Sequence, residues 1–310
     1  MTFAIAVSLM FVLMRLAPGD PLARMQEGRA VTLEEIAHTR AMYGLDRPLG
    51  VQFAAFLGGV VRGDLGISIE HGIPVTSLLA ARLLPTFLLG ATTILLNFTI
   101  GVWLGVVQAV RRNSRLDWAL TALSLTGYAM PSFWLGLVLA WLVGIKLHWL
   151  PVAGMMSPLI PPDAPWLTRA TDIAAHLILP AITLSAVTIA GTMRYQRTAL
   201  IEVLRLPYIG TARAKGLPEA AVVWRHAWRN ALFPVITLFG LWLPLLVTGS
   251  VFVEMVFAWP GLGLLAATAA SSRDYPLVMG AALLAAGLVV TASFLTDLAY
   301  AVLDPRVRYS

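Results

Sequence analysis

The sequence lacks cysteine altogether and is poor in charge. Of its 310 residues, 12% are charged, whereas 58% are hydrophobic. The absence of cysteine excludes disulfides, thiolate metal ligands and thiol nucleophiles. Because a soluble domain carries about 25% charged residues, this composition, with a mean hydropathy of +0.79, identifies an integral membrane protein. The net charge of +6 then reflects basic loops rather than nucleic-acid binding.

Motifs of catalysis are missing as well. The chain has no G-x-x-x-x-G-K-[ST] phosphate loop, no H-E-x-x-H zinc helix and no G-x-S-x-G nucleophile turn. We therefore expect no catalytic, cofactor-binding or metal-ligating residues on this chain. If the protein performs active transport, its energy must come from another subunit.

Long apolar runs are what the sequence does have. A helix needs about 20 residues to cross about 30 Å of hydrocarbon. The simplest count is six spans in an all-α, polytopic protein, with residues 1–310 forming one transmembrane domain. The predicted spans are Met1 to Leu16, Leu83 to Val110, Trp118 to Leu147, His176 to Met193, Ala231 to Val253 and Leu277 to Tyr300.

The distribution of Lys and Arg predicts the orientation. One side, which includes the loop from Arg194 to Arg229 and the C-terminal tail, holds 12 of the 22 basic residues but only five of the 16 acidic ones. That side is expected to be cytoplasmic. Both termini then lie in the cytoplasm, and an outer segment from Pro18 to Arg82 faces outward.

The outer segment has the pattern of short surface helices. Thr32 and Glu35 have the spacing of a capping box, and the helix that they begin should stop before Gly44. A second helix is predicted from Val51 to Val61, ending at Gly63. Its residues Phe53, Phe56 and Leu57 are expected to face lipid or protein.

Charged residues inside the spans would mark a transport pathway, and the sequence predicts few. Lys146, Arg194 and Glu254 all fall near predicted interfaces, where they can reach the headgroups. His148 and His176 are expected to be solvated, and Asp297 is ambiguous. No proton relay is evident, which argues against transport driven by an ion gradient.

Small residues and prolines suggest where spans pack or bend. Gly101 and Gly105 form a small-xxx-small pair, which favours close packing of helices within the subunit over a specific dimer seam. Pro131 and Pro244 each remove a backbone hydrogen bond in mid-span, which predicts a bent helix or a cavity lining. The polar residues near these prolines are the candidate pore-lining positions: Thr126, Ser132, Thr248 and Ser250.

The loop from Tyr195 to Asn230 is polar, basic and rich in helix-boundary signals. Pro207 should end the helix that continues the fourth span, and a short helix from Tyr208 to Lys215 should end at Gly216. Pro218 and Glu219 suit the start of a third helix. The pattern predicts a helix-turn-helix hairpin, which either docks a protein or lies on the lipid surface. The tight turn from Lys215 to Pro218 favours docking.

At these residues the chain resembles permease subunits of binding-protein-dependent ABC importers, of the dipeptide, oligopeptide and nickel branch. That family carries the motif E-A-A, three residues, then Gly. Here Gly210 to Ala212 occupy the E-A-A positions and Gly216 matches the glycine, but the Glu is missing. The resemblance implies ATPase coupling through Gly210, Thr211, Ala212, Arg213, Ala214, Lys215, Gly216, Leu217 and Glu219.

Further motifs extend the resemblance over essentially the whole chain. They include the run from Arg15 to Pro21, the sequence Tyr43 to Asp46, the run from Phe257 to Gly263 and the tail from Leu303 to Tyr309. The family usually begins with a basic cytoplasmic leader. The sequence begins without this leader, which is consistent with a late start codon or with a shortened chain.

The resemblance implies a type I ABC importer permease in a bacterial cytoplasmic (inner) membrane. Its expected partners are a homologous second permease, two ATPase subunits that carry ATP and Mg, an extracytoplasmic substrate-binding protein and membrane lipid, but no nucleic acid. No cofactor is expected on the chain itself. Peptides, nickel chelates, glutathione and some glycans are all compatible substrates. The alternative is an ion-coupled secondary carrier, which would require coupling-ion sites at mid-membrane and an inverted repeat.

Overall fold

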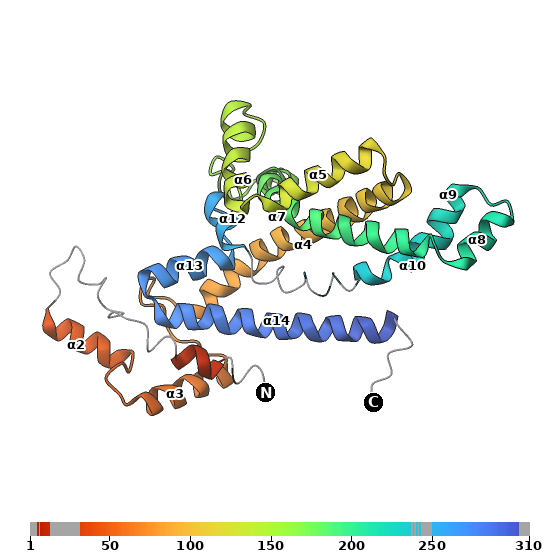
Figure 1. Ribbon diagram of the computed structural model, residues 1–310. Helices are drawn as coiled ribbons and strands as arrows, with labels where there is room; N and C mark the ends of the chain where they lie inside the picture. The colour runs from red at the N-terminus through yellow and green to blue at the C-terminus, as the bar shows by residue number, and fades with distance from the viewer. Residues whose placement is uncertain are drawn as a thin grey trace. The chain divides into compact units, whose positions relative to one another are not determined.

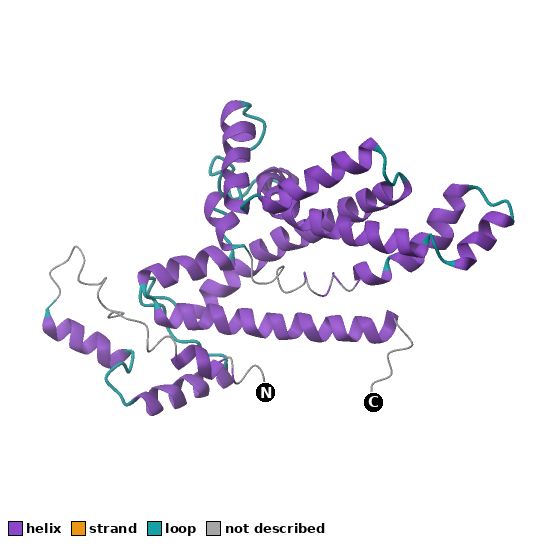
Figure 2. Cartoon of the chain, viewed as in Figure 1, coloured by secondary structure: helices purple, strands orange, loops and turns teal. Residues whose placement is uncertain are grey.

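The protein is helical throughout the part that the structure describes (Figures 1 and 2). The computed structural model describes residues 5, 7–12, 32–236, 238, 240, 242 and 250–303. Within these residues no strand occurs, and one antiparallel bridge pairs Ile67 with Pro74. The prediction of an all-α fold is confirmed. The chain divides into two compact units, residues 1–84 with 261–291 and residues 85–260 with 292–310.

The first unit contains the predicted surface helices. Helix α2, Leu33–Met42, begins with the predicted capping box: Thr32 N donates to Glu35 Oε2 at 3.0 Å, and Glu35 N donates to Thr32 Oγ1 at 3.2 Å. Helix α3, Leu49–Arg62, ends at Gly63, whose φ of 75° is left-handed. Phe53 and Phe56 of α3 both pack against Phe11. The two predicted short helices are therefore confirmed, and their position outside the membrane stays a prediction.

A buried aspartate connects the remaining elements of the first unit. Helices α13, Leu262–Ser272, and α14, Tyr275–Leu303, share an apolar core with the start of α4, Val75–Val110. Between α13 and α14, the fully buried Asp274 accepts hydrogen bonds from the Ser68 hydroxyl and from Glu70 N. This carboxylate therefore fixes the hairpin around residues 67–74 to the start of α14.

The second unit is built around two long helices and two apolar cores. Helix α4 continues to Val110, and α7 spans Trp166–Val203. One core contains Leu89, Leu179 and the fully buried Phe257 and Trp259, which follow helix α12, Val251–Val256. Trp259 Nε1 donates to Pro85 O at 3.0 Å inside this region. Such a bond satisfies an indole donor that burial would otherwise leave unpaired.

Three helices in the described residues are long and apolar enough to span a membrane, judged by length and composition: Val75–Val110, Trp166–Val203 and Tyr275–Leu298. They correspond to the predicted second, fourth and sixth spans, each of which extends further than predicted at one or both ends. The predicted first and fifth spans lie partly outside the described residues.

The predicted third span is not one straight helix. It consists of α5, Arg115–Ala129, and α6, Ser132–Leu139, which continues as a π-helical segment, η2, Ala140–Lys146. The two parts are bent by 103° at the break before Pro131. Pro131 cannot donate a backbone hydrogen bond, and it disfavours a helical conformation for Met130, whose ψ is 130°. The bend that Pro131 predicts in the third span is therefore confirmed, and it divides this span into two helical parts.

The packing of Gly101 and Gly105 is as predicted. A Cβ at Gly105 would lie 2.6 Å from Met193 O and 2.7 Å from Gln196 Cβ, and one at Gly101 would lie 3.0 Å from Thr192 Cβ. Both glycines therefore allow α4 and α7 to approach closely within the subunit, as small residues do where lipid provides no hydrophobic drive.

Two ionisable residues are more buried than predicted. His176 is only 6% exposed, and its Nδ1 lies 2.9 Å from Asp172 O and 3.4 Å from Asp172 Oδ2. Glu254 is completely buried in α12. The expectation that these two groups are solvated at an interface is wrong, because tertiary packing covers them. Lys146, in contrast, lies 5.6 Å from the centroid of the Trp141 ring, as expected for an interfacial lysine.

Candidate functional site

The polar loop after α7 forms a compact helical hairpin (Figure 1). Helix α8, Pro207–Ala214, begins with proline at its first position, as the missing N–H of proline permits. Gly216 then has a φ of 77°, a conformation that residues with a Cβ rarely adopt. After the extended Pro218, the chain returns through α9, Glu219–Ala221, the π-helical η3, Val222–Ala227, and α10, Trp228–Ala231. The predicted helix, turn and returning helix are confirmed.

One face of α8 fixes the hairpin to the rest of the second unit. Ile209 is completely buried and Ala212 is 7% exposed, and both belong to a core with Leu200 of α7, Val106 of α4 and Val223 of η3. Residues three apart lie on the same face of a helix. The hairpin is therefore packed against the ends of two long helices rather than joined to them by a flexible linker.

The opposite face of α8 and the turn are exposed. Of the nine predicted coupling residues, only Ala212 is buried; the exposed ones are Gly210, Thr211, Arg213, Ala214, Lys215, Gly216, Leu217 and Glu219. A Cβ at Gly210 would meet no atom within 4 Å. The structure thus brings these residues together on one solvent-accessible surface.

An ion pair spans the turn. Arg213 Nε donates to Glu219 Oε2 at 3.1 Å, and Arg213 Nη2 donates to Glu219 Oε1 at 2.6 Å. These hydrogen bonds lower the pKa of Glu219 and raise that of Arg213. The two side chains are about half exposed, at 45% and 56%, so the pair contributes geometry more than stability.

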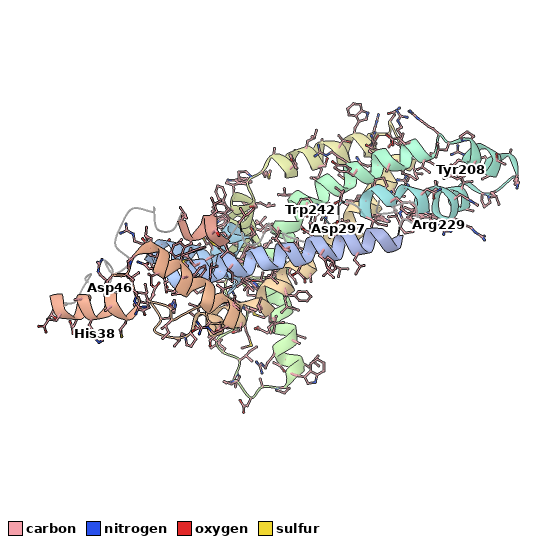
Figure 3. The ribbon with its side chains drawn as sticks, turned by 90° about the horizontal axis from the view of Figure 1, so that it is seen from below. His38, Asp46, Tyr208, Arg229, Trp242 and Asp297 are labelled. Carbon is pink, nitrogen blue, oxygen red and sulfur yellow. The ribbon has the colours of Figure 1, made fainter. Side chains whose placement is uncertain are left out.

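The base of the hairpin is closed by Tyr208 (Figure 3). Its hydroxyl donates to His226 O at 3.3 Å and accepts from Asn230 Nδ2 at 2.6 Å. The rings of Trp224 and Trp228 pack edge to face, with centroids 5.5 Å apart. Trp224 is nevertheless 47% exposed, so the aromatic pair of the returning helix is buried only in part.

Three of the four candidate pore-lining residues lie among the described residues. Thr126 is exposed on α5 and donates to Ala122 O at 2.9 Å, while Ser132 starts α6 on the other side of the bend. Ser250 immediately precedes α12. Thr248 and Pro244 lie outside the described residues. Their role in a pore remains a prediction.

Sequence reasoning missed a buried polar residue with several hydrogen-bond partners in the described part of this unit. Asp117 is one of the five acidic residues on the predicted cytoplasmic side, but its carboxylate is 5% exposed and accepts a forked pair of hydrogen bonds from Arg197. The spacing of Ser114 and Asp117, a helix-capping pattern, indicates the start of α5. It gives no indication of a partner 80 residues away.

The long apolar helices and the exposed hairpin define the class of the protein: a helical membrane component with a solvent-exposed helical hairpin. Two family models match the chain. The model of the binding-protein-dependent transport system inner membrane component matches residues 97–309, and the model of the N-terminal part of such membrane components matches residues 1–87. The chain belongs to this family, and it is a multi-pass inner membrane protein.

Curated relatives agree over nearly the whole length. The chain is 44% identical to a putative peptide permease protein of Brucella suis and 41% identical to the oligopeptide transport system permease protein of Bacillus subtilis, in each case over 97% of this chain and 93% of the relative. It is 38% identical to the dipeptide transport system permease protein of Escherichia coli, over 99% of this chain and 95% of the relative. The family consists of transport components, not enzymes.

Proposed function

We propose that this chain is the permease subunit of an ATP-driven peptide importer, in which it forms half of the translocation pore. The proposal rests on one observation above all. The hairpin packs through Ile209 and Ala212 onto the ends of α4 and α7, and it presents the other predicted coupling residues to the aqueous phase. A motor protein that moved this surface would therefore move two apolar helices with it.

Peptides are the substrate class that the relatives favour. The three relatives described above are named as peptide, oligopeptide and dipeptide permeases. The chain itself offers no group of three or more acidic, His or Cys side chains arranged for a metal among its described residues. We therefore infer a small peptide as substrate in preference to a metal ion held by the permease.

The proposed assembly contains several partners of stated roles. A homologous second permease completes the pore, and an extracytoplasmic binding protein delivers the substrate. Two ATPase subunits, which carry ATP and Mg, dock on the hairpin. In this arrangement the hairpin and both chain termini are cytoplasmic, as the excess of basic residues on that side favours.

The orientation has a direct test, because the chain contains no native cysteine. Single cysteines at Lys215 in the hairpin and at Asp46 in the turn after α2 can each be labelled in intact cells with a membrane-impermeant maleimide. Asp46→Cys should react from outside, and Lys215→Cys should react only after the membrane is opened. The reverse pattern would contradict the proposed orientation.

Transport itself is tested by reconstitution of the full complex in liposomes, with radiolabelled dialanine as the probe. We expect uptake that requires ATP on the hairpin side and the binding protein on the other side. Uptake without ATP that collapses on addition of a protonophore would instead support the alternative, an ion-coupled secondary carrier. The buried His176 and Glu254 are the groups that would make this alternative worth testing.

A further inference from the structure

Asp117 is held by four hydrogen-bond donors at the start of α5. Arg197 Nε reaches Asp117 Oδ1 at 2.9 Å, and Arg197 Nη2 reaches Oδ2 at 2.8 Å. The remaining donors are Asn113 N, 3.0 Å from Oδ2, and Gln108 Nε2, 3.3 Å from Oδ1. A forked arginine pair fixes both distance and orientation, which a single contact does not. This carboxylate therefore ties together α4, α5 and α7.

The pair lies next to the anchor of the hairpin. On α7, Arg197 is followed by the core residues Ala199 and Leu200, and on α4, Gln108 is followed by the core residue Ala109. The same apolar core holds Ile209 and Ala212 of α8. The step from the hairpin to Asp117 therefore passes only through packed side chains and two helix ends. Such packed interiors transmit displacement because they contain little free volume.

Helix α5 carries the connection away from the hairpin. It lies beside α7 (Figure 1), where a Cβ at Gly127 would be 3.8 Å from Ala186 O. A second link joins the same two helices, because the Arg194 guanidinium lies 5.0 Å from the centroid of the Tyr128 ring. The connection ends at Ala129, where the chain turns by 103° into α6.

We propose that Asp117 and Arg197 are positioning residues that form a rigid connection. Their ion pair makes the hairpin, the end of α7 and α5 move as one rigid body. Movement of the hairpin is then delivered to the bend before Pro131, and α6 changes its angle relative to α5. The pair acts through the helices that it joins and contacts no substrate. The inference rests on the proposed function only for the motor that drives the hairpin.

The absence of native cysteine permits a distance measurement in the assembled transporter. One pair of spin labels, at Arg225→Cys in the hairpin and Leu123→Cys on α5, lies within the proposed rigid body. A second pair, at Arg225→Cys and Leu137→Cys on α6, lies across the bend. All three positions are exposed. Distances are measured by double electron-electron resonance, without nucleotide and with ATP and vanadate.

We expect the first distance to keep its mean and width in both states, while the second distance shifts. Arg197→Gln should broaden the first distribution, and Arg197→Lys, which keeps the charge but loses the fork, should broaden it less. Arg169→Gln, an exposed arginine at the other end of α7, is the matched control and should leave it sharp. Uptake per ATP hydrolysed should fall about tenfold in Arg197→Gln but not in the control.

Two results would refute the proposed rigid connection. One is a first distance that shifts with nucleotide as much as the second, and the other is a first distance distribution that stays sharp in Arg197→Gln. If neither distance responds to nucleotide in the unaltered protein, the proposed ATP-driven function fails. In that case, broadening in Arg197→Gln still supports the rigid connection, and its absence still refutes it. The Arg197→Lys variant answers the same question if Arg197→Gln does not assemble.

Discussion

Arg213 and Glu219, on opposite sides of the turn at Gly216, are joined by two hydrogen bonds of 3.1 and 2.6 Å. The hairpin thus uses one of its basic residues to hold its own shape. Lys215, between them, extends from the turn and is exposed. The two neighbouring cations therefore differ in their surroundings: Arg213 orders the hairpin, whereas Lys215 is exposed and is the one that we propose to contact the ATPase subunits.

The first prediction concerns charge at the hairpin surface. Lys215→Glu should weaken binding of the ATPase subunits without altering the hairpin. Arg213→Glu should weaken this binding and also distort the hairpin, because it places a second carboxylate beside Glu219. Recovery of the ATPases by co-purification measures docking. Because Arg213 acts by holding the turn, the double change Arg213→Glu with Glu219→Arg should restore both the turn and the docking. Undiminished recovery with Lys215→Glu would contradict the role of this residue.

The turn should loosen in acid. Because Arg213 lowers the pKa of Glu219 in the folded hairpin, the contribution of the pair is fully present above the ordinary glutamate pKa of about 4.3 and is lost as the pH falls through the lowered value. A spin label at Leu217→Cys should become more mobile in that acidic range and should not change between neutral and mildly acidic pH. In a Glu219→Gln background this acid transition should be absent.

Replacement of Gly216 by valine should uncouple ATP hydrolysis from uptake. A β-branched residue at a φ of 77° is strained by about 1–2 kcal/mol, and relief of this strain would move the exposed turn. The control is Gly50→Ala on α3, outside the predicted coupling residues, where the added Cβ meets no atom within 4 Å. The measured quantity is uptake per ATP in the reconstituted complex. Equal coupling in the valine variant would show that the turn conformation does not matter.

A methyl group at Gly105 should destabilise the packing of α4 on α7. The added Cβ would lie 2.6 Å from the backbone oxygen of Met193, which cannot rotate away as a side chain could. Overpacking of this kind costs about 1–3 kcal/mol, and we expect a lower melting temperature in detergent. Gly191→Ala on α7 is the matched control, because its Cβ would meet no atom within 4 Å. Similar melting of the two variants would refute the predicted close contact.

Trp259→Phe should lower the stability of the protein more than an equivalent substitution at the surface. It leaves Pro85 O without the indole donor at 3.0 Å in a buried region, a loss of about 1–3 kcal/mol. Trp149 is 72% exposed, so Trp149→Phe should leave the melting temperature nearly unchanged. A Trp259→Phe variant as stable as the unaltered protein would show that the carbonyl finds another partner.

Local signals in the sequence were sufficient wherever neighbouring residues decide the structure. The capping box of Thr32 and Glu35, the left-handed Gly216 and the end of the preceding helix before Pro207 were all predicted correctly, because each depends on residues a few positions apart. The break at Pro131 was visible as a proline. The bend angle could not be predicted, because a proline determines where a regular helix stops but not the direction in which the next segment packs.

By itself the sequence determined that this is an all-α membrane protein with an elaborate polar hairpin, because hydropathy, charge and turn chemistry are local properties. Only the tertiary structure decided which side chains of the hairpin are buried and that Arg213, rather than Lys215, pairs with Glu219 within it. The contact between Asp117 and Arg197 was likewise decided by tertiary structure. The same holds for the burial of His176 and Glu254. These outcomes depend on contacts between residues far apart in the chain, which no local pattern specifies.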